Sequence, residues 1–85
     1  MNIVEQLKNL LDETLHLHGA SAGWSRDTHL LGSVAELDSL AVAEVISAIE
    51  RSFGFSIYDD EINADIFATL GSLADFVVQK KAATP

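Results

Sequence analysis

The chain has 85 residues, of which 48% are hydrophobic, and its formal net charge at pH 7 is −8. A chain of this length has room for one domain with a single core. The excess of acidic residues argues against binding to nucleic acid or to an anionic membrane surface, and it favours partners with basic patches. The chain contains no cysteine and shows no secretion signal at its start, so we expect a cytoplasmic protein without disulfides.

The first periodic segment predicts a helix from about Ile3 to about Leu17. Its apolar side recurs at spacings of three and four residues, at Ile3, Leu7, Leu10, Leu11 and Thr14. We expect Gly19 to end this helix, because glycine readily adopts the left-handed conformation found after helix C-termini.

Residues 20–36 lose this periodicity and are rich in turn-forming residues, which predicts a long loop. A loop of this length in a small domain often has a functional role. We expect Leu30, Leu31 and Leu37 to attach the loop to the core. Trp24 is expected to serve packing rather than a binding site.

The next segment predicts a helix that begins at Asp38 or Ser39 and ends near Phe53, just before Gly54. Apolar residues again recur at helical spacing. The expected buried stripe consists of Leu40, Ala43, Ile46 and Phe53, broadened by Val45 and Ile49.

The last third of the chain predicts an extended connector at residues 55–57 and a short acidic helix at residues 59–62. A final helix is expected to start after Gly71, with Thr69 or Ser72 as its cap, and to fray at Lys80-Lys81. It should bury Leu73, Phe76 and Val77, and residues 82–85 should form a loose tail.

The predicted architecture is therefore an all-α bundle of three main helices plus one short helix, with a long loop after the first helix. We expect residues 1–85 to form a single domain.

No residue pattern indicates a catalytic or metal site. The histidines His16, His18 and His29 lack the spacing of metal-binding pairs. The Gly-x-Ser-x-Gly pattern of serine hydrolases is also absent around Ser39. We therefore expect no bound metal and no enzymatic activity.

The most informative motif is Leu37-Asp38-Ser39-Leu40, at the start of the second predicted helix. A serine there lies where backbone N–H groups and the helix dipole favour an attached anionic group. Leu37 and Leu40 would anchor the segment while Ser39 points outward. The alternative is a helical interaction module in which Asp38 or Ser39 only caps the helix.

From about Ile3 to Val77 the chain resembles the acyl carrier protein family. The resemblance is strongest at residues 36–40, Glu-Leu-Asp-Ser-Leu, which match the family's Asp-Ser-Leu motif at the start of its second helix. Further matching stretches are residues 44–46 and 48–50, Phe53-Gly54-Phe55, Asp59-Asp60-Glu61 and Ala68-Thr69-Leu70.

The resemblance implies that a phosphopantetheinyl transferase attaches 4′-phosphopantetheine to Ser39, and that Asp38 helps this enzyme to bind its metal ion. The terminal thiol of the arm would carry an acyl group as a thioester, which supplies the sulfur that the chain lacks. An acyl pocket would be formed by Val45, Ile46, Ile49, Ile62 and Phe67. From the residues alone ordinary core is the better interpretation of these five, and in the family the core and the acyl pocket overlap.

Partner enzymes of this family dock on the second helix through basic patches. The expected docking face here consists of Leu40, Val42, Glu44, Glu50 and Arg51, with Val42 exposed beside the modified serine. The face departs from the family pattern, because Ala41, Val42, Ser47 and Arg51 stand where acidic residues are common. The expected partners are the phosphopantetheinyl transferase and acyl-ligase, synthase or transferase enzymes, and the expected state is a monomer.

This departure favours a bacterial-like carrier in a specialised lipid, polyketide or surface-polysaccharide pathway over the housekeeping carrier of fatty acid synthesis. Residues 38–42 look like those of carriers from bacterial exopolysaccharide clusters. Residues 67–73 are similar to peptidyl carriers, so an aminoacyl cargo is the alternative.

Overall fold

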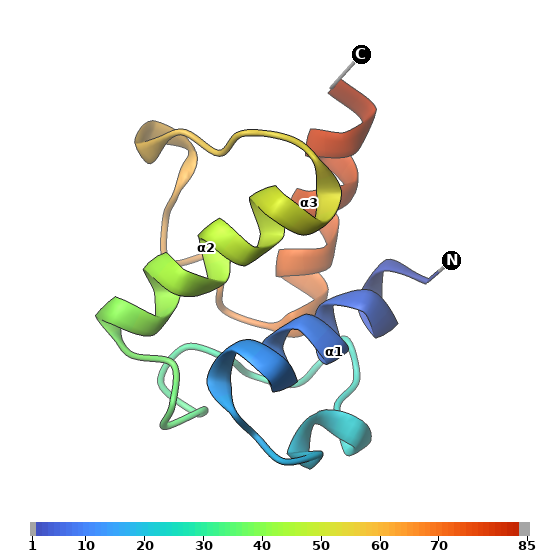
Figure 1. Ribbon diagram of the computed structural model, residues 1–85, viewed down its shortest axis with the longest axis vertical. Helices are drawn as coiled ribbons and strands as arrows, with labels where there is room; N and C mark the ends of the chain where they lie inside the picture. The colour runs from blue at the N-terminus through green and yellow to red at the C-terminus, as the bar shows by residue number, and fades with distance from the viewer. Residues whose placement is uncertain (1, 84–85) are drawn as a thin grey trace.

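The structure, a computed structural model, describes residues 2–83. Its elements in chain order are α1 (Ile3–Leu15), a 3-10 helix (Ala20–Gly23), α2 (Ser39–Phe53), a second 3-10 helix (Asp59–Glu61) and α3 (Leu70–Ala83). Figure 1 shows the three long helices around one centre, with the α1–α2 connection running below them. Residues 2–83 contain no β-strand, and a single antiparallel bridge pairs His29 with Thr69. The predicted all-α fold is confirmed, and its short helix has the 3-10 form.

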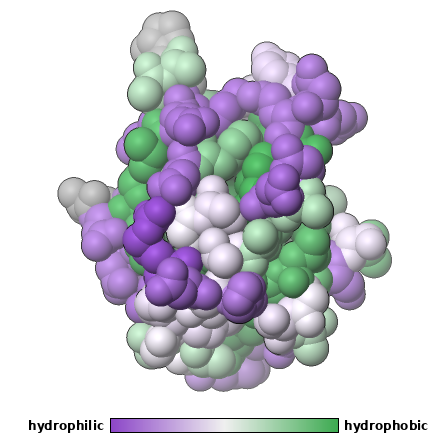
Figure 2. Space-filling model, turned by 180° about the vertical axis from the view of Figure 1, so that it is seen from behind, coloured by the Kyte–Doolittle hydropathy of each residue, from purple (hydrophilic) through white to green (hydrophobic). Residues whose placement is uncertain are grey.

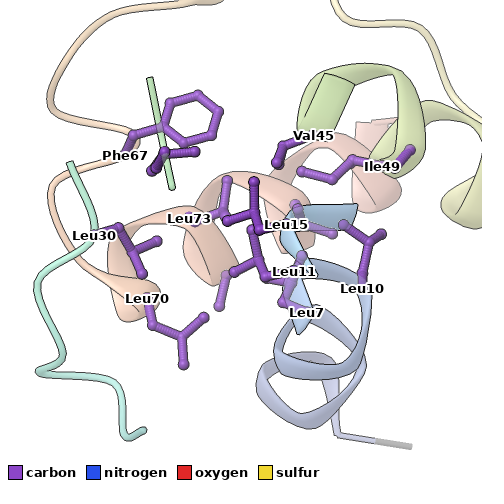
Figure 3. Close-up of a cluster of buried hydrophobic side chains, with 14 of the residues drawn as sticks. Leu7, Leu10, Leu11, Leu15, Leu30, Val45, Ile49, Phe67, Leu70 and Leu73 are labelled. Atoms are coloured by element: carbon purple, nitrogen blue, oxygen red, sulfur yellow. The ribbon is translucent and has the colours of Figure 1, made fainter. Parts of the chain in front are cut away.

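Apolar side chains from all three long helices meet in the core (Figure 3). Leu7 and Leu11 of α1, Val45 and Ile49 of α2, and Leu73 of α3 are fully buried. Burial of such a side chain stabilises the fold by about 1.5–3 kcal/mol. Apolar burial is the dominant favourable contribution to folding, and here it joins all three long helices.

The first helix ends two residues earlier than the sequence indicates. Its C-terminal residue is Leu15, and His16 adopts the left-handed conformation with a φ of 56°. The Asp12 carboxylate explains the early end, because it accepts hydrogen bonds from Gly19 N–H at 3.0 Å and from Ser21 Oγ–H at 2.6 Å. These bonds draw the chain back into the 3-10 helix that follows.

The long connection is attached to the core by only two of the three leucines expected to do so. Leu30 and Leu37 are buried, whereas the side chain of Leu31 is 42% exposed. Leu30 and Leu31 both donate backbone hydrogen bonds to the segment before α3, at Ala68 O and Phe67 O. In such an extended pair, successive side chains point to opposite sides, so only one of two neighbouring leucines faces the core.

The buried side of α2 differs from the predicted stripe. Ala41, Val45, Ala48 and Ile49 are buried, while Ala43 is exposed and Leu40 is 79% exposed. Ile46 and Phe53 are half-buried at the edge of the core. The helix is turned so that its small alanines face inward, because small side chains let neighbouring helices approach closely. Gly54 ends the helix as predicted, in the left-handed conformation with a φ of 76°.

The last helix begins at Leu70, so Gly71 lies inside its first turn instead of before it. Thr69 caps the helix: its Oγ1 accepts from Ser72 N–H, and Ser72 Oγ accepts from Thr69 N–H, both at 3.1 Å. Leu73 and Val77 are buried, whereas Phe76 is only half-buried.

At its other end α3 continues to Ala83, beyond the expected fraying point. Lys80 Nζ lies 2.8 Å from a Glu61 carboxylate oxygen and 5.6 Å from the centre of the Tyr58 ring. These contacts hold the last turns against residues 58–61. Ala82 and Ala83 are therefore helical, and the other tail residues, 84–85, lie outside the described residues.

Within residues 2–83, the exposed large apolar side chains are Leu31, Leu40, Tyr58 and Val78. Figure 2, which views the molecule from behind, shows hydrophilic residues separating smaller apolar areas. None of the helices described is long and apolar enough to cross a bilayer.

Candidate cofactor-attachment site

Ser39 is the first residue of α2, and its side chain is exposed. Leu37, two residues earlier, is buried and attaches the preceding loop to the core. Leu40 was expected to anchor the other side, but it points into solvent instead. The hydroxyl of Ser39 makes no hydrogen bond to any described residue, so it is accessible to a modifying enzyme.

The backbone at the start of α2 leaves two donors open. The N–H of Ala41 donates to Asp38 Oδ1, and the N–H of Val42 donates to Asp38 O, both at 2.9 Å. The N–H groups of Ser39 and Leu40 have no acceptor among residues 2–83. These donors and the positive end of the helix dipole favour an anion such as a phosphate attached to Ser39.

Asp38 is the N-cap of α2, with an extended backbone and an exposed side chain. Its Oδ1 is occupied by the Ala41 N–H, while Oδ2 has no hydrogen bond within the described part of the chain. The residue can therefore cap the helix with one oxygen and offer the other to a metal ion held by a visiting enzyme.

The surroundings of Ser39 lack the parts of a hydrolytic site. A serine nucleophile needs a base within hydrogen-bond reach, and no hydrogen bond joins Ser39 to a histidine or a carboxylate in residues 2–83. That range also holds no group of three histidine or acidic side chains arranged for a metal ion. The Ser39 oxygen is therefore free of such contacts and is open to accept a group.

The five residues expected to form the docking face do not share one environment. Leu40, Glu44 and Arg51 are exposed. Val42 was expected to be exposed, but it is half-buried against the core, because it lies on the inward flank of the rotated helix. Glu50 is half-buried as well, and its Oε2 accepts from the Ile57 N–H at 2.7 Å, which ties down the connector after α2.

The five residues of the expected acyl pocket lie in the core or at its edge. Val45, Ile49 and Phe67 are buried; in Figure 3 Phe67 lies on the left of the cluster, and Val45 and Ile49 lie on the right. Ile46 and Ile62 are half-buried and pack against the core. The set therefore consists of three interior residues and two at the surface edge.

Several polar contacts that the sequence did not indicate lie on other parts of the fold. Hydrogen bonds from the Ser21 hydroxyl and the Gly19 N–H hold the pKa of Asp12 below its usual value. Lys80 and the Tyr58 N–H similarly lower the pKa of Glu61. These contacts join residues that are 9 and 19 positions apart in the sequence and that meet only when the chain folds back. Helical periodicity, which relates residues three or four apart, therefore gives no sign of them.

Comparisons with known proteins agree with this geometry. Residues 5–77 match the family described as "phosphopantetheine attachment site". The chain is also similar to a holo acyl carrier protein from Nitrosomonas europaea, solved by NMR in solution, with a TM-score of 0.86 and 43% sequence identity over 99% of this chain and 100% of that one. A search of curated proteins found no match. The protein therefore belongs to the acyl carrier protein family, which is defined by a covalently attached phosphopantetheine.

Proposed function

We propose that Ser39 Oγ carries 4′-phosphopantetheine, and that the protein holds an acyl group on this arm and presents it to partner enzymes without catalysing a reaction itself. The observation that carries the proposal is the exposed, unbonded hydroxyl at the start of α2, inside the segment that matches the family. When bound, the arm supplies the thiol that forms the thioester.

The donors around Ser39 suit the phosphate of such an arm. The open N–H groups of Ser39 and Leu40 provide hydrogen bonds and partial positive charge. Asp38 caps the helix and leaves Oδ2 available for the metal ion of a phosphopantetheinyl transferase. This division of its two oxygens supports an accessory role for Asp38 in modification.

Incubation of the protein with coenzyme A, Mg²⁺ and a promiscuous phosphopantetheinyl transferase tests the proposal. We expect the intact mass to increase by one phosphopantetheine and fragment spectra to place it on Ser39. Ser39→Ala should gain nothing, while Ser72→Ala should still be modified. If the wild type gains no mass with several transferases, the helical interaction module becomes the better account.

The expected acyl pocket remains part of this proposal. Ile46 and Ile62 lie at the edge of the core, and Val45, Ile49 and Phe67 lie behind them. An acyl chain could enter there by displacing the edge residues. Loading with acyl groups of increasing length should then shift the NMR signals of these five residues more than those of Leu7 and Leu11.

We further propose a specialised lipid, polyketide or surface-polysaccharide pathway, because the exposed side of α2 carries Leu40 and Arg51 as well as Glu44. A carrier with less acidity on this helix should suit different enzymes from those that bind a fully acidic one. The mass of the thioester on protein purified from its source cells identifies the cargo. An amino acid on the arm would favour the alternative, an aminoacyl carrier.

A further inference from the structure

A groove follows the seam between α1 and α2 and begins beside the attachment serine. It consists of three adjoining hollows of about 330, 540 and 500 Å³. Asp38 and Leu40, the residues on either side of Ser39 in the sequence, both line the first hollow. Thr14 lines all three hollows, and Arg51 lines the second and the third. The groove therefore leads from the start of α2 to its last turn.

The walls of this groove carry polar side chains that have no hydrogen-bond partner within residues 2–83. These side chains belong to Gln6, Asn9, Thr14, Ser47, Ser52 and Arg51. They offer amide, hydroxyl and guanidinium donors as well as amide and hydroxyl acceptors. Glu13 and Glu44, which line the middle hollow, disfavour an anion there and accept from N–H or O–H groups. The groove therefore suits an uncharged ligand that has amides and hydroxyls of its own.

The phosphopantetheine arm proposed for Ser39 has this chemistry and the matching length. Beyond its phosphate the arm is uncharged, and it carries a hydroxyl, two amides and a terminal thiol. Its chain of about 14 bonds spans about 18 Å when it is extended. From Ser39 to Arg51 the helix rises by a similar distance, about 18 Å. An arm attached at Ser39 can therefore reach the far end of the groove.

The phosphate of the arm does not need to enter the groove. Neighbouring residues of an α-helix are about 100° apart around its axis, so Ser39 is not on the side of α2 that Leu40 presents to the first hollow. Ser39 is, however, the first residue of the helix, and no helical turn precedes it. The phosphate can therefore remain at the open N–H groups of Ser39 and Leu40 while the uncharged part of the arm turns into the groove.

Covalent attachment selects the arm over any free ligand. A group held on a short flexible tether has an effective concentration on the order of 1 mM at a neighbouring surface. A free metabolite of the same chemistry would have to reach a similar concentration to compete. A few hydrogen bonds to the walls are therefore enough to keep the arm in the groove.

We propose that the unloaded arm, with its thiol free, rests in the groove between α1 and α2, where Thr14, Ser47 and Arg51 contact its hydroxyl and amides. The proposal rests on the carrier function proposed above. The apolar edge at Ile46 and Ile62 lies outside the three hollows and offers an acyl chain what the polar groove does not. The two places therefore suit two states of the arm, unloaded and loaded.

NMR spectra of the apo protein and of the holo protein with a free thiol provide the first test. We expect conversion to the holo form to shift the side-chain amide signals of Gln6 and Asn9 and the backbone signals of Thr14 and Ser47. Signals of α3 should stay in place. Shifts confined to the residues next to Ser39 would overturn the proposal, because the arm would then make no contact with the groove.

A spin label locates the end of the arm directly. Because the chain contains no cysteine, a nitroxide maleimide reacts with the thiol of the arm and with no other thiol. We expect the label to broaden the signals of Gln6 and Asn9 relative to the same protein with the nitroxide reduced. Equal broadening over all exposed helix surfaces, or broadening centred on Ile46 and Ile62, would overturn the proposal.

Two variants separate the groove from the rest of the surface. Ser47→Trp places a large ring in the groove at an exposed position, and Val78→Trp places the same ring on the exposed side of α3. Intact mass should show both converted to the holo form. Ser47→Trp should then lose most of the shift and broadening at Gln6 and Asn9, whereas Val78→Trp should retain both.

Equal shifts and broadening in the two tryptophan variants would also overturn the groove as the resting place of the arm. If the wild type gains no phosphopantetheine at Ser39, the result would instead contradict the carrier function on which the proposal rests. Intact mass thus distinguishes the two failures before any spectrum is recorded.

Discussion

The backbone N–H groups at the starts of α2 and α3 are hydrogen-bonded to different extents. At α3 the first four backbone N–H groups are all paired: Leu70 donates to Thr28 O, Gly71 to Arg26 O, and Ser72 and Leu73 to Thr69. At α2 only the N–H groups of Ala41 and Val42 are paired, both with Asp38. The start of α3 is covered by the long connection between α1 and α2, whereas the start of α2 faces solvent.

The two serines near these ends follow the same contrast. The single proton of Ser72 Oγ is shared between the backbone oxygens of Ile66 and Thr69, at 2.8 and 2.9 Å, and the Oγ also accepts from the Thr69 N–H. Ser39 makes no such bond. A helix N-terminus helps to hold neighbouring segments together where its N–H groups are hydrogen-bonded to them. It can bind an anion where its N–H groups have no acceptor.

The largest expected effect on stability comes from Gly71→Ala. A Cβ at this position would lie 2.9 Å from Arg26 O and 3.1 Å from Arg26 Cβ, so the connection would have to move off α3. Alanine normally favours a helix over glycine by about 1 kcal/mol, but overpacking against backbone costs about 1–3 kcal/mol and should prevail. Urea denaturation should show the loss.

Gly23→Ala is the matched control, because its Cβ would meet no atom within 4 Å. We expect that variant to unfold at the wild-type urea concentration or slightly above it. If Gly71→Ala were as stable as Gly23→Ala, the segment at Arg26 could move away from α3 without loss of stability. The start of α3 would then not be more tightly packed than the start of α2.

The next effect separates the two serines. Ser72→Ala should lower the free energy of unfolding by about 0.5–2 kcal/mol, because it removes the capping bond to the Thr69 N–H and leaves the Ile66 carbonyl oxygen without its donor. Ser39→Ala should change it by less than about 0.5 kcal/mol, because that side chain is exposed and unbonded. Thermal or urea unfolding of both variants measures the difference, and equal losses would contradict it.

Asp38 allows the two roles of the open end to be separated. Asp38→Ala should cost about 0.5–2 kcal/mol of stability through loss of the cap, whereas Asp38→Asn should retain the cap almost fully. If the free Oδ2 assists the transferase, Asp38→Asn should nevertheless be modified more slowly. Normal modification of a stable Asp38→Asn protein would confine the residue to capping.

The smallest expected effect is on the loss of stability at low pH. The pKa of Asp12 is lowered by its bonds to Ser21 and Gly19, so its stabilising contribution is complete above the unfolded-state pKa of about 4 and is lost as pH falls further. Glu61 acts in the same direction through Lys80. Asp12→Asn should therefore show a shallower fall in urea midpoint than the wild type between about pH 5 and pH 3.

Much of the helical framework could be predicted from local signals. The cap at Asp38, the glycine at position 54 and the spacing of Leu7, Leu10 and Leu11 are each read within a few residues of the chain. The same is true of the position of Ser39 at a helix start. Such features are local because capping bonds and helical periodicity join neighbours in sequence.

The tertiary structure alone decided which side of α2 is buried. Leu40 and Ala41 are both compatible with an apolar stripe, but Ala41 is buried against the other helices and Leu40 is exposed. It also placed Gly71 within a helix against Arg26, and it brought Lys80 to Glu61. These outcomes depend on contacts between segments far apart in the chain, which no local pattern contains. The same rotation of α2 left Leu40 and Arg51 exposed.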